Sequence, residues 1–126
     1  MTLNRALRLR KGSDFQRVRQ QGRSITSRLL ILAWVPNEVT TLRVGFVVSK
    51  RISKLAVKRN HIKRLLSEAI RPVLPEVSGG WDIVVSARQA ILSADLSTLQ
   101  HDIVTLLYRA RLLESASNKT TAEPGT

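Results

Sequence analysis

The chain has 126 residues, 43% of them hydrophobic, which suffices for one domain with a buried core. It contains no cysteine, which excludes disulfides, thiolate zinc sites and a cysteine nucleophile. The net charge of +12 is concentrated in residues 1–71, where 17 basic side chains accompany three acidic ones, so a single polyanion-binding surface is favoured over an evenly solvated one.

Two features argue against a membrane protein or an exported one. The longest apolar run, residues 29–35, is far too short to span a bilayer. Four basic residues interrupt the first eleven positions, so no signal-peptide core follows Met1. An anionic membrane surface is a weak alternative, because the basic helix described below lacks aromatic residues. We therefore expect a cytosolic, bacterial protein.

The N-terminal third predicts one helix and three strands. Ser13 and Gln16 have capping-box spacing and Gly22 is a helix stop, which predicts a helix over residues 14–21. Strands are expected near residues 24–26, 28–35 and 41–49, with a turn at Pro36. Because the join at residues 36–40 is short, the last two strands are predicted to pair antiparallel.

The rest of the chain predicts two helices around one buried strand. An apolar arc repeats at helical spacing over residues 55–71, and prolines follow it. A strand at 81–87 and a helix at 97–113 complete the order α-β-β-β-α-β-α. We expect an α+β fold, a two-layer sandwich with a central four-stranded sheet and helices packed on one face. Residues 1–114 would form one domain, and residues 115–126 a disordered tail.

The basic helix offers a surface suited to phosphates. Residues 43–64 include eight Lys or Arg and no Asp or Glu. Arg59 and Lys63 lie one helical turn apart, as do Asn60 and Arg64, so such pairs can follow neighbouring phosphates. Asn60 is neutral, and a base edge, a 2′-hydroxyl or nearby backbone are all open as its partner. The alternative is a solvated helix face without a partner.

Phe15 has two interpretations that the sequence leaves open. It is either a core residue of the first helix or a stacking face for an unpaired base beside Arg17 and Arg19.

Catalytic side chains are not expected in this chain. The two histidines, His61 and His101, are isolated, and the three acidic residues of the basic half are well separated. No paired carboxylates, metal-ligand spacing or phosphate-binding glycine loop is present. We predict no catalytic residue and no metal ligand. Nucleic acid is the favoured partner, which fits an RNA-binding module such as a ribosomal protein or, more weakly, a DNA-binding protein.

Four blocks resemble the protein subunit of bacterial ribonuclease P. Residues 56–64 (AVKRNHIKR) resemble its Arg-Asn-Arg signature, which is highly specific. Residues 43–51 (RVGFVVSKR), 14–18 (DFQRV) with Gly22, and 82–88 (DIVVSAR) are weaker matches in the family's order. The resemblance spans roughly residues 7–113. It implies an α/β sandwich whose connection between parallel strands is left-handed, against the usual rule.

The resemblance also implies a function. The family's complex is an endoribonuclease that removes the 5′ leader of precursor tRNA, with its active site and catalytic Mg²⁺ held mainly by a large RNA, and no cofactor bound by the protein alone. The implied partners are that RNA and precursor tRNA, with no membrane or DNA. By motif match the RNA contacts are Lys50, Arg51, Arg59, Asn60, Lys63 and Arg64, and the leader contacts are Phe15 and Arg17.

This chain departs from the family pattern at four positions. His61 and Ser67 stand where the signature commonly has arginine, which lowers the charge facing the RNA. Arg19 and Ala33 fill cleft positions that are aromatic in some members, so their part in leader binding is open.

Overall fold

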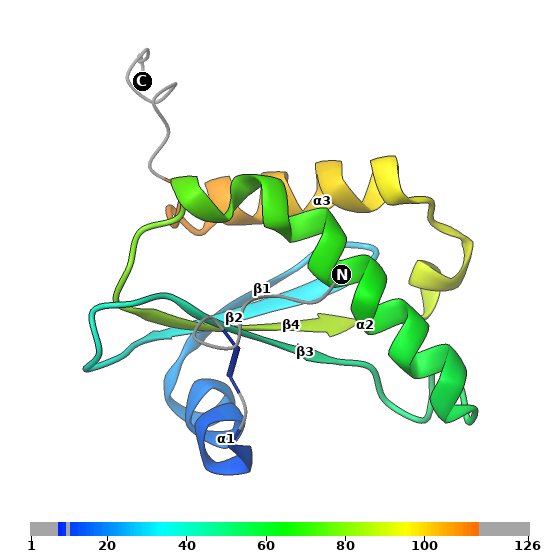
Figure 1. Ribbon diagram of the computed structural model, residues 1–126, viewed down its shortest axis with the longest axis horizontal. Coiled ribbons are helices and arrows are strands. Elements are labelled where there is room, and N and C mark those ends of the chain that lie inside the picture. Colours follow the sequence, from blue (N-terminus) through cyan, green and yellow to red (C-terminus); the bar gives the residue numbers. More distant parts are fainter. Residues whose placement is uncertain (1–7, 10, 114–126) are drawn as a thin grey trace.

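The computed structural model describes residues 8–9 and 11–113, which form a four-stranded sheet with helices on both faces (Figure 1). The elements are α1 (Gly12–Gln21), β1 (Arg23–Thr26), β2 (Leu30–Pro36), β3 (Arg43–Val47), α2 (Ala56–Ile70), β4 (Trp81–Ala87) and α3 (Leu96–Arg109). Two short 3₁₀ helices, Arg71–Glu76 and Gln89–Ser93, flank β4 in the chain. The predicted α+β class and element order are confirmed. The predicted tail, residues 115–126, lies outside the described residues.

The order of strands in the sheet is β1-β2-β4-β3, so the predicted pairing of β2 with β3 is wrong. β4 lies between them, antiparallel to β2 and parallel to β3. Ile83, Val84 and Val85 at the centre of β4 are each at most 1% exposed. A strand that is apolar on both faces is best accommodated with a neighbour at each edge. Because β2 and β3 are then only about 10 Å apart, the short join between them still reaches across β4.

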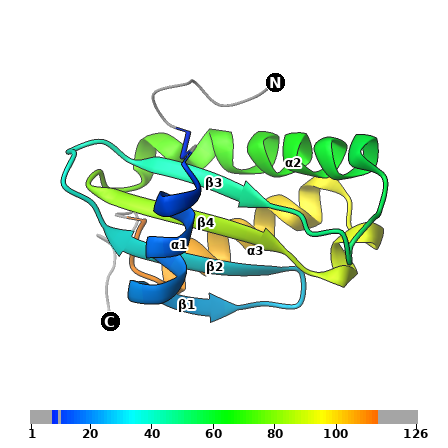
Figure 2. The ribbon, with the colours of Figure 1, turned by 90° about the horizontal axis from the view of Figure 1, so that it is seen from below.

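The connection from β3 through α2 to β4 is left-handed, as the resemblance implied. Figure 2 shows β3 and β4 pointing the same way while α2 runs back behind the sheet. After α2, the chain enters the sheet as β4 on one side of β3, whereas a right-handed crossover would place it on the other side. As a result α2 lies along the β3 edge of the molecule.

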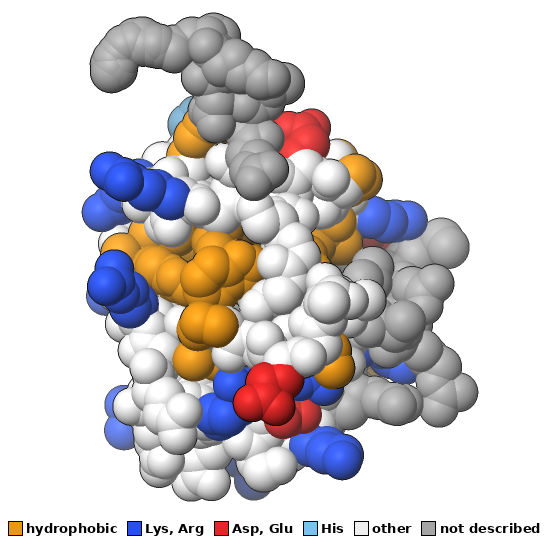
Figure 3. Space-filling view, turned by 90° about the vertical axis from the view of Figure 1, so that its left-hand side faces the viewer, with side chains coloured by type: hydrophobic (Ala, Val, Ile, Leu, Met, Phe, Trp, Pro, Cys, Tyr) orange, Lys and Arg blue, Asp and Glu red, His pale blue; other side chains and the backbone are white. Residues whose placement is uncertain are grey.

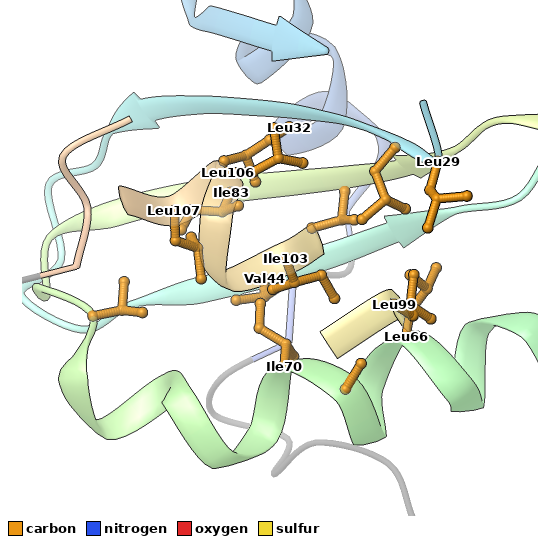
Figure 4. Close-up of a cluster of buried hydrophobic side chains, with 14 of the residues drawn as sticks. Leu29, Leu32, Val44, Leu66, Ile70, Ile83, Leu99, Ile103, Leu106 and Leu107 are labelled. Atoms are coloured by element: carbon orange, nitrogen blue, oxygen red, sulfur yellow. The ribbon is translucent and has the colours of Figure 1, made fainter. Parts of the chain in front are cut away.

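The main core lies between the sheet and the pair α2 and α3 (Figure 4). From the sheet, Leu32 and Ile83 contribute to it, and from the helices Leu66, Ile70 and Leu107 do so, all at most 2% exposed. Burying each such side chain stabilises the fold by about 1.5–3 kcal/mol.

α1 covers the other face of the sheet, which corrects the expectation that all helices share one face. Val18 is fully buried there against Ala33, Val35 and Val84. The reason lies in the strands: β2 and β4 are apolar on both faces, so the second face also needs a cover.

Two helices, α1 and α3, begin at residues other than those predicted. α1 begins at Gly12 with Lys11 as N-cap, and the Lys11 carbonyl accepts from the amides of Asp14 and Phe15. There is no side-chain cap, because a lysine side chain has no acceptor. The predicted capping box is therefore absent. α3 is capped instead by Asp95, whose carboxylate accepts from the Thr98 amide at 2.8 Å. That hydrogen bond lowers the pKa of Asp95.

Candidate nucleic-acid interface

The faces of α2 separate as the sequence predicts. Ile62, Leu66 and Ile70 are buried in the main core, whereas Lys63 and Arg64 are exposed. Asn60 is exposed on the same outer side, and Lys50 and Arg51 lie exposed in the turn before the helix. Arg59 is half-buried, and its guanidinium donates to the Ser53 carbonyl at 3.0 Å. Arg59 therefore also braces the turn that leads into α2.

The positive charge of α2 is compensated within the helix only by Glu68, near its C-terminal end. The first turn of α2 has no acidic residue, and its N-cap, Leu55, provides no side-chain hydrogen bond. No Asp or Glu occurs between Arg43 and Glu68 in the chain. Since the helix macrodipole adds partial positive charge at the same end, the surface favours a polyanion.

A groove of about 590 Å³ joins the two predicted sites. Phe15 lines it from α1, and Asn60, Lys63 and Arg64 line it from α2. We call it the Phe15 groove. Its floor is the edge strand β3, and Arg8 lines it from the N-terminal segment, which bridges to Val44 in parallel. One elongated ligand lying in this groove would touch both helices.

Arg8 was missed by the sequence reasoning, although it carries a specific signal in the structure. Its Nε atom is buried and has no hydrogen-bond partner within the described residues. A buried donor without a partner costs about 1–3 kcal/mol. An acceptor supplied by a bound ligand would remove that cost, and a phosphate oxygen is the natural acceptor for a guanidinium.

Phe15 turns out to be both a packing residue and a groove residue. It is half-buried, packs against the buried cluster that contains Val18, Ala33 and Val84, and lines the groove. Its ring lies directly on Gly45, where a Cβ would come within 2.4 Å of Phe15 Cζ. A glycine inside an otherwise apolar strand often marks such a close approach, so Gly45 was a readable signal.

A second groove, of about 360 Å³, lies on the same sheet face beside the end of α1. It brings Arg19 and Ala33 together, the two positions whose role the sequence left open. Arg23, Ser49 and Ser86 add polar groups to its wall. We call it the Arg19 groove. Ala33 forms an apolar floor without an aromatic ring, while Arg19 and Arg23 are exposed cations suited to phosphates.

Arg17 lines neither of these two grooves. Its guanidinium pairs with the fully buried Asp82 carboxylate and donates to the Pro36 carbonyl at 3.1 Å. Arg43 binds the same carboxylate in a bidentate manner at 2.9 Å, and the hydrogen bond raises the pKa of Arg43. Asn37 adds a further bond at 2.9 Å. This Asp82 cluster ties α1 to the sheet, and the sequence reasoning did not find it.

The described residues contain no cluster of three His, Cys, Asp or Glu side chains suited to a metal ion. His61 is exposed on α2, and Asp102 accepts a hydrogen bond from Ser27 Oγ. Within those residues, no helix combines the length and apolar character needed to cross a membrane.

The end of the molecule that carries the β2–β3 join and the C-terminal end of α3 looks different from the α2 surface (Figure 3). There the basic side chains are scattered around an apolar area, and acidic side chains lie among those near the bottom of the view. This end of the molecule therefore lacks a continuous basic surface.

Comparison with known sequences gives one family. The family model described as Ribonuclease P matches residues 3–111. A ribonuclease P protein component from Chloroflexus aurantiacus is 44% identical over 119 residues, which cover 94% of this chain and 87% of that protein.

Solved structures agree with this result. An RNase P protein from Staphylococcus aureus, described as a mutant with defective mRNA degradation activity, superposes with a TM-score of 0.78 at 31% identity. The match covers 86% of this chain and 91% of that one. The RNase P protein from Thermotoga maritima superposes with a TM-score of 0.73 at 28% identity, covering 81% of this chain and 96% of that one.

Proposed function

Because the chain belongs to the family of bacterial ribonuclease P protein components, we propose that it binds the catalytic RNA of ribonuclease P and the 5′ leader of precursor tRNA. The complex then removes the leader and forms the mature 5′ end of the tRNA. The observation that carries this proposal is the Phe15 groove, in which an aromatic ring and a strongly basic helix line one channel.

The RNA contacts are assigned to the α2 side. The proposed set is Lys50, Arg51, Arg59, Asn60, Lys63 and Arg64. Lys63 and Arg64 are exposed and hold phosphates, while Asn60 at the groove wall donates to a base edge or a 2′-hydroxyl. Arg59 acts partly by bracing the turn before α2.

The leader is proposed to lie along the sheet face beside α1. Phe15 offers part of its ring for stacking on an unpaired base, which is worth about 1–3 kcal/mol. Arg19 and Arg23 in the Arg19 groove then hold leader phosphates. Arg17, the other residue implied by the resemblance, contributes mainly by holding α1 through Asp82.

Bond cleavage is assigned to the RNA. The described residues offer no cluster of metal ligands, so the Mg²⁺ ions of the reaction are proposed to be held mainly by the RNA, and the protein positions the substrate. The cytoplasm, where tRNA precursors are processed in bacteria, is the proposed location.

Reconstitution with the cognate RNA tests the proposal. The protein should lower the Mg²⁺ concentration that the RNA needs to process precursor tRNA, and protein alone should leave precursor tRNA intact. Cleavage of precursor tRNA by the protein alone in Mg²⁺ buffer would refute RNA catalysis. The S. aureus structure is described as a mutant with defective mRNA degradation activity. The protein alone should therefore also be incubated with an mRNA fragment as a second substrate.

A binding experiment separates the alternatives. RNA that co-purifies with the chain should be one structured species of a few hundred nucleotides. Ribosomal RNA instead would favour a ribosomal module, and preference for duplex DNA over structured RNA at fixed salt would favour a DNA-binding protein. Lys63→Ala with Arg64→Ala should reduce the slope of log affinity against log salt by about 1.5 units.

A further inference from the structure

The two most exposed large hydrophobic side chains in the described residues lie at the start of the basic helix. Val57 is 82% exposed and Leu55 is 66% exposed, against at most 46% for the other exposed ones. Single exposed apolar residues are common on protein surfaces. Here, however, two of them lie two positions apart, and neither belongs to either hydrophobic cluster of the fold. Folding therefore does not explain their presence.

The surroundings of this pair are basic. Lys54 and Lys58 are exposed neighbours in the chain. Val57 shares a helix face with His61 and Arg64, one and two turns further along α2. With no acidic residue between Arg43 and Glu68 in the chain, the apolar pair is set among cations. A partner that covers it must offer an apolar face bordered by negative charge.

We propose that Leu55 and Val57 pack against the face of an unpaired nucleotide of the RNA, whose flanking phosphates are bound by Lys54 and Lys58. This inference rests on the proposed function. A base face is apolar and lies between two phosphates, which matches the pattern of the surface. In an A-form duplex the bases are stacked and the major groove is too deep and narrow for side chains, so only a bulge, loop or single strand presents such a face.

Other occupants fit less well. A second copy of the chain would bring +12 against +12. A membrane-surface helix places bulky aromatic side chains on its apolar side, and α2 has none. A protein groove would need an acidic rim to accommodate the neighbouring lysines.

The test combines affinity with its salt dependence. Leu55→Ala with Val57→Ala removes five side-chain carbons, part of whose apolar surface is buried on binding. The double variant should therefore bind the cognate RNA about tenfold more weakly at every salt concentration. The slope of log affinity against log salt should stay unchanged, since no counterion-releasing charge is removed. Alanine is a better helix former than valine, so α2 is kept. Lys58→Ala should instead lower the slope by about one unit.

The controls distinguish the possible failures. Leu92→Ala, which truncates a 46% exposed leucine in the Gln89–Ser93 helix, should leave affinity unchanged. The loss in the double variant should be absent with a fully paired RNA duplex of equal length. Affinity within twofold of the parent, a reduced salt slope, or an equal loss on the duplex would each overturn the inference. Failure of the parent chain to bind RNA at all would overturn the proposed function itself, and this inference with it.

Discussion

Asp82→Asn is the substitution that best tests how α1 is held. Asn has nearly the same volume as Asp, so no cavity forms, but the charge that faces two guanidinium groups is lost. Arg43 makes two bonds of 2.9 Å to this fully buried carboxylate, and Arg17 pairs with its other side. After the substitution both cations remain close together, and the nearby acid is Asp14, 3.8 Å from Arg43.

The magnitude follows from the exposure of the partners. Breaking a buried ion pair by removing one partner costs about 3–5 kcal/mol. The side chains of Arg17 and Arg43 keep 30% and 28% of their exposure, so water compensates in part, and we expect the lower end, about 3 kcal/mol. Since a domain of this size is stable by about 5–15 kcal/mol, this is a large fraction of the total.

Urea unfolding followed by circular dichroism measures the effect. With a slope of about 1.5 kcal/mol per molar urea, the midpoint should fall by about 2 M. Glu38→Gln, at an exposed acid near the same arginines, is the matched control and should stay within about 0.5 kcal/mol. In an Arg43→Met background, Asp82→Asn should cost less because one cation is already gone. A loss below about 1 kcal/mol would refute the idea that the Asp82 cluster anchors α1.

Three further outcomes are expected. Gly45→Ala should displace the Phe15 ring and lower the free energy of unfolding, measured by thermal unfolding, by about 1–3 kcal/mol. Phe15→Leu in the same chain should recover part of that stability. An unchanged stability of Gly45→Ala would mean that the ring does not rest on the strand. Gly22→Ala should cost more than Gly45→Ala, because its Cβ would meet main-chain oxygens at 2.4 and 2.5 Å, which cannot rotate away; equal costs would contradict this. Asp95→Ala should lower the melting temperature by a few degrees. Since the Thr98 amide lowers the pKa of Asp95, the difference from the parent should be full above its ordinary value of 3.8 and vanish as the pH falls through the lower folded value.

The periodic segments were predictable because a single local rule decides them. The bounds of β4 match the prediction, and α2 differs by one residue at each end, since apolar spacing and prolines mark them. The order of strands was not predictable in this way. Whether β2 pairs with β3 or accepts β4 between them depends on the burial of both faces of β4, which is a property of the complete sheet.

The site was predictable in its charge and not in its geometry. Helical spacing already placed Lys63 and Arg64 on one outer face. Phe15 lines the same groove as Lys63 and Arg64 because of the left-handed path of α2 and the close approach at Gly45. Both features lie at least 30 residues from Phe15 along the chain, so no local pattern reveals them. The Asp82 cluster also required long-range information. The register of β4 against β3 sets Arg43 opposite Asp82, and the packing of α1 on the sheet brings Arg17 to the same carboxylate.

The central position of β4 has a consequence for synthesis of the chain. β1 and β2 can pair as soon as they leave the ribosome, but β3 has no hydrogen-bonded strand beside it until residue 87 has emerged, after the whole of α2. The sheet is therefore closed by long-range contacts, which slows folding relative to a simple meander. During that interval the edge of β3 that β4 later occupies is open to association with other chains. The basic helix is the segment made in that interval, so its like charge also keeps nascent chains apart.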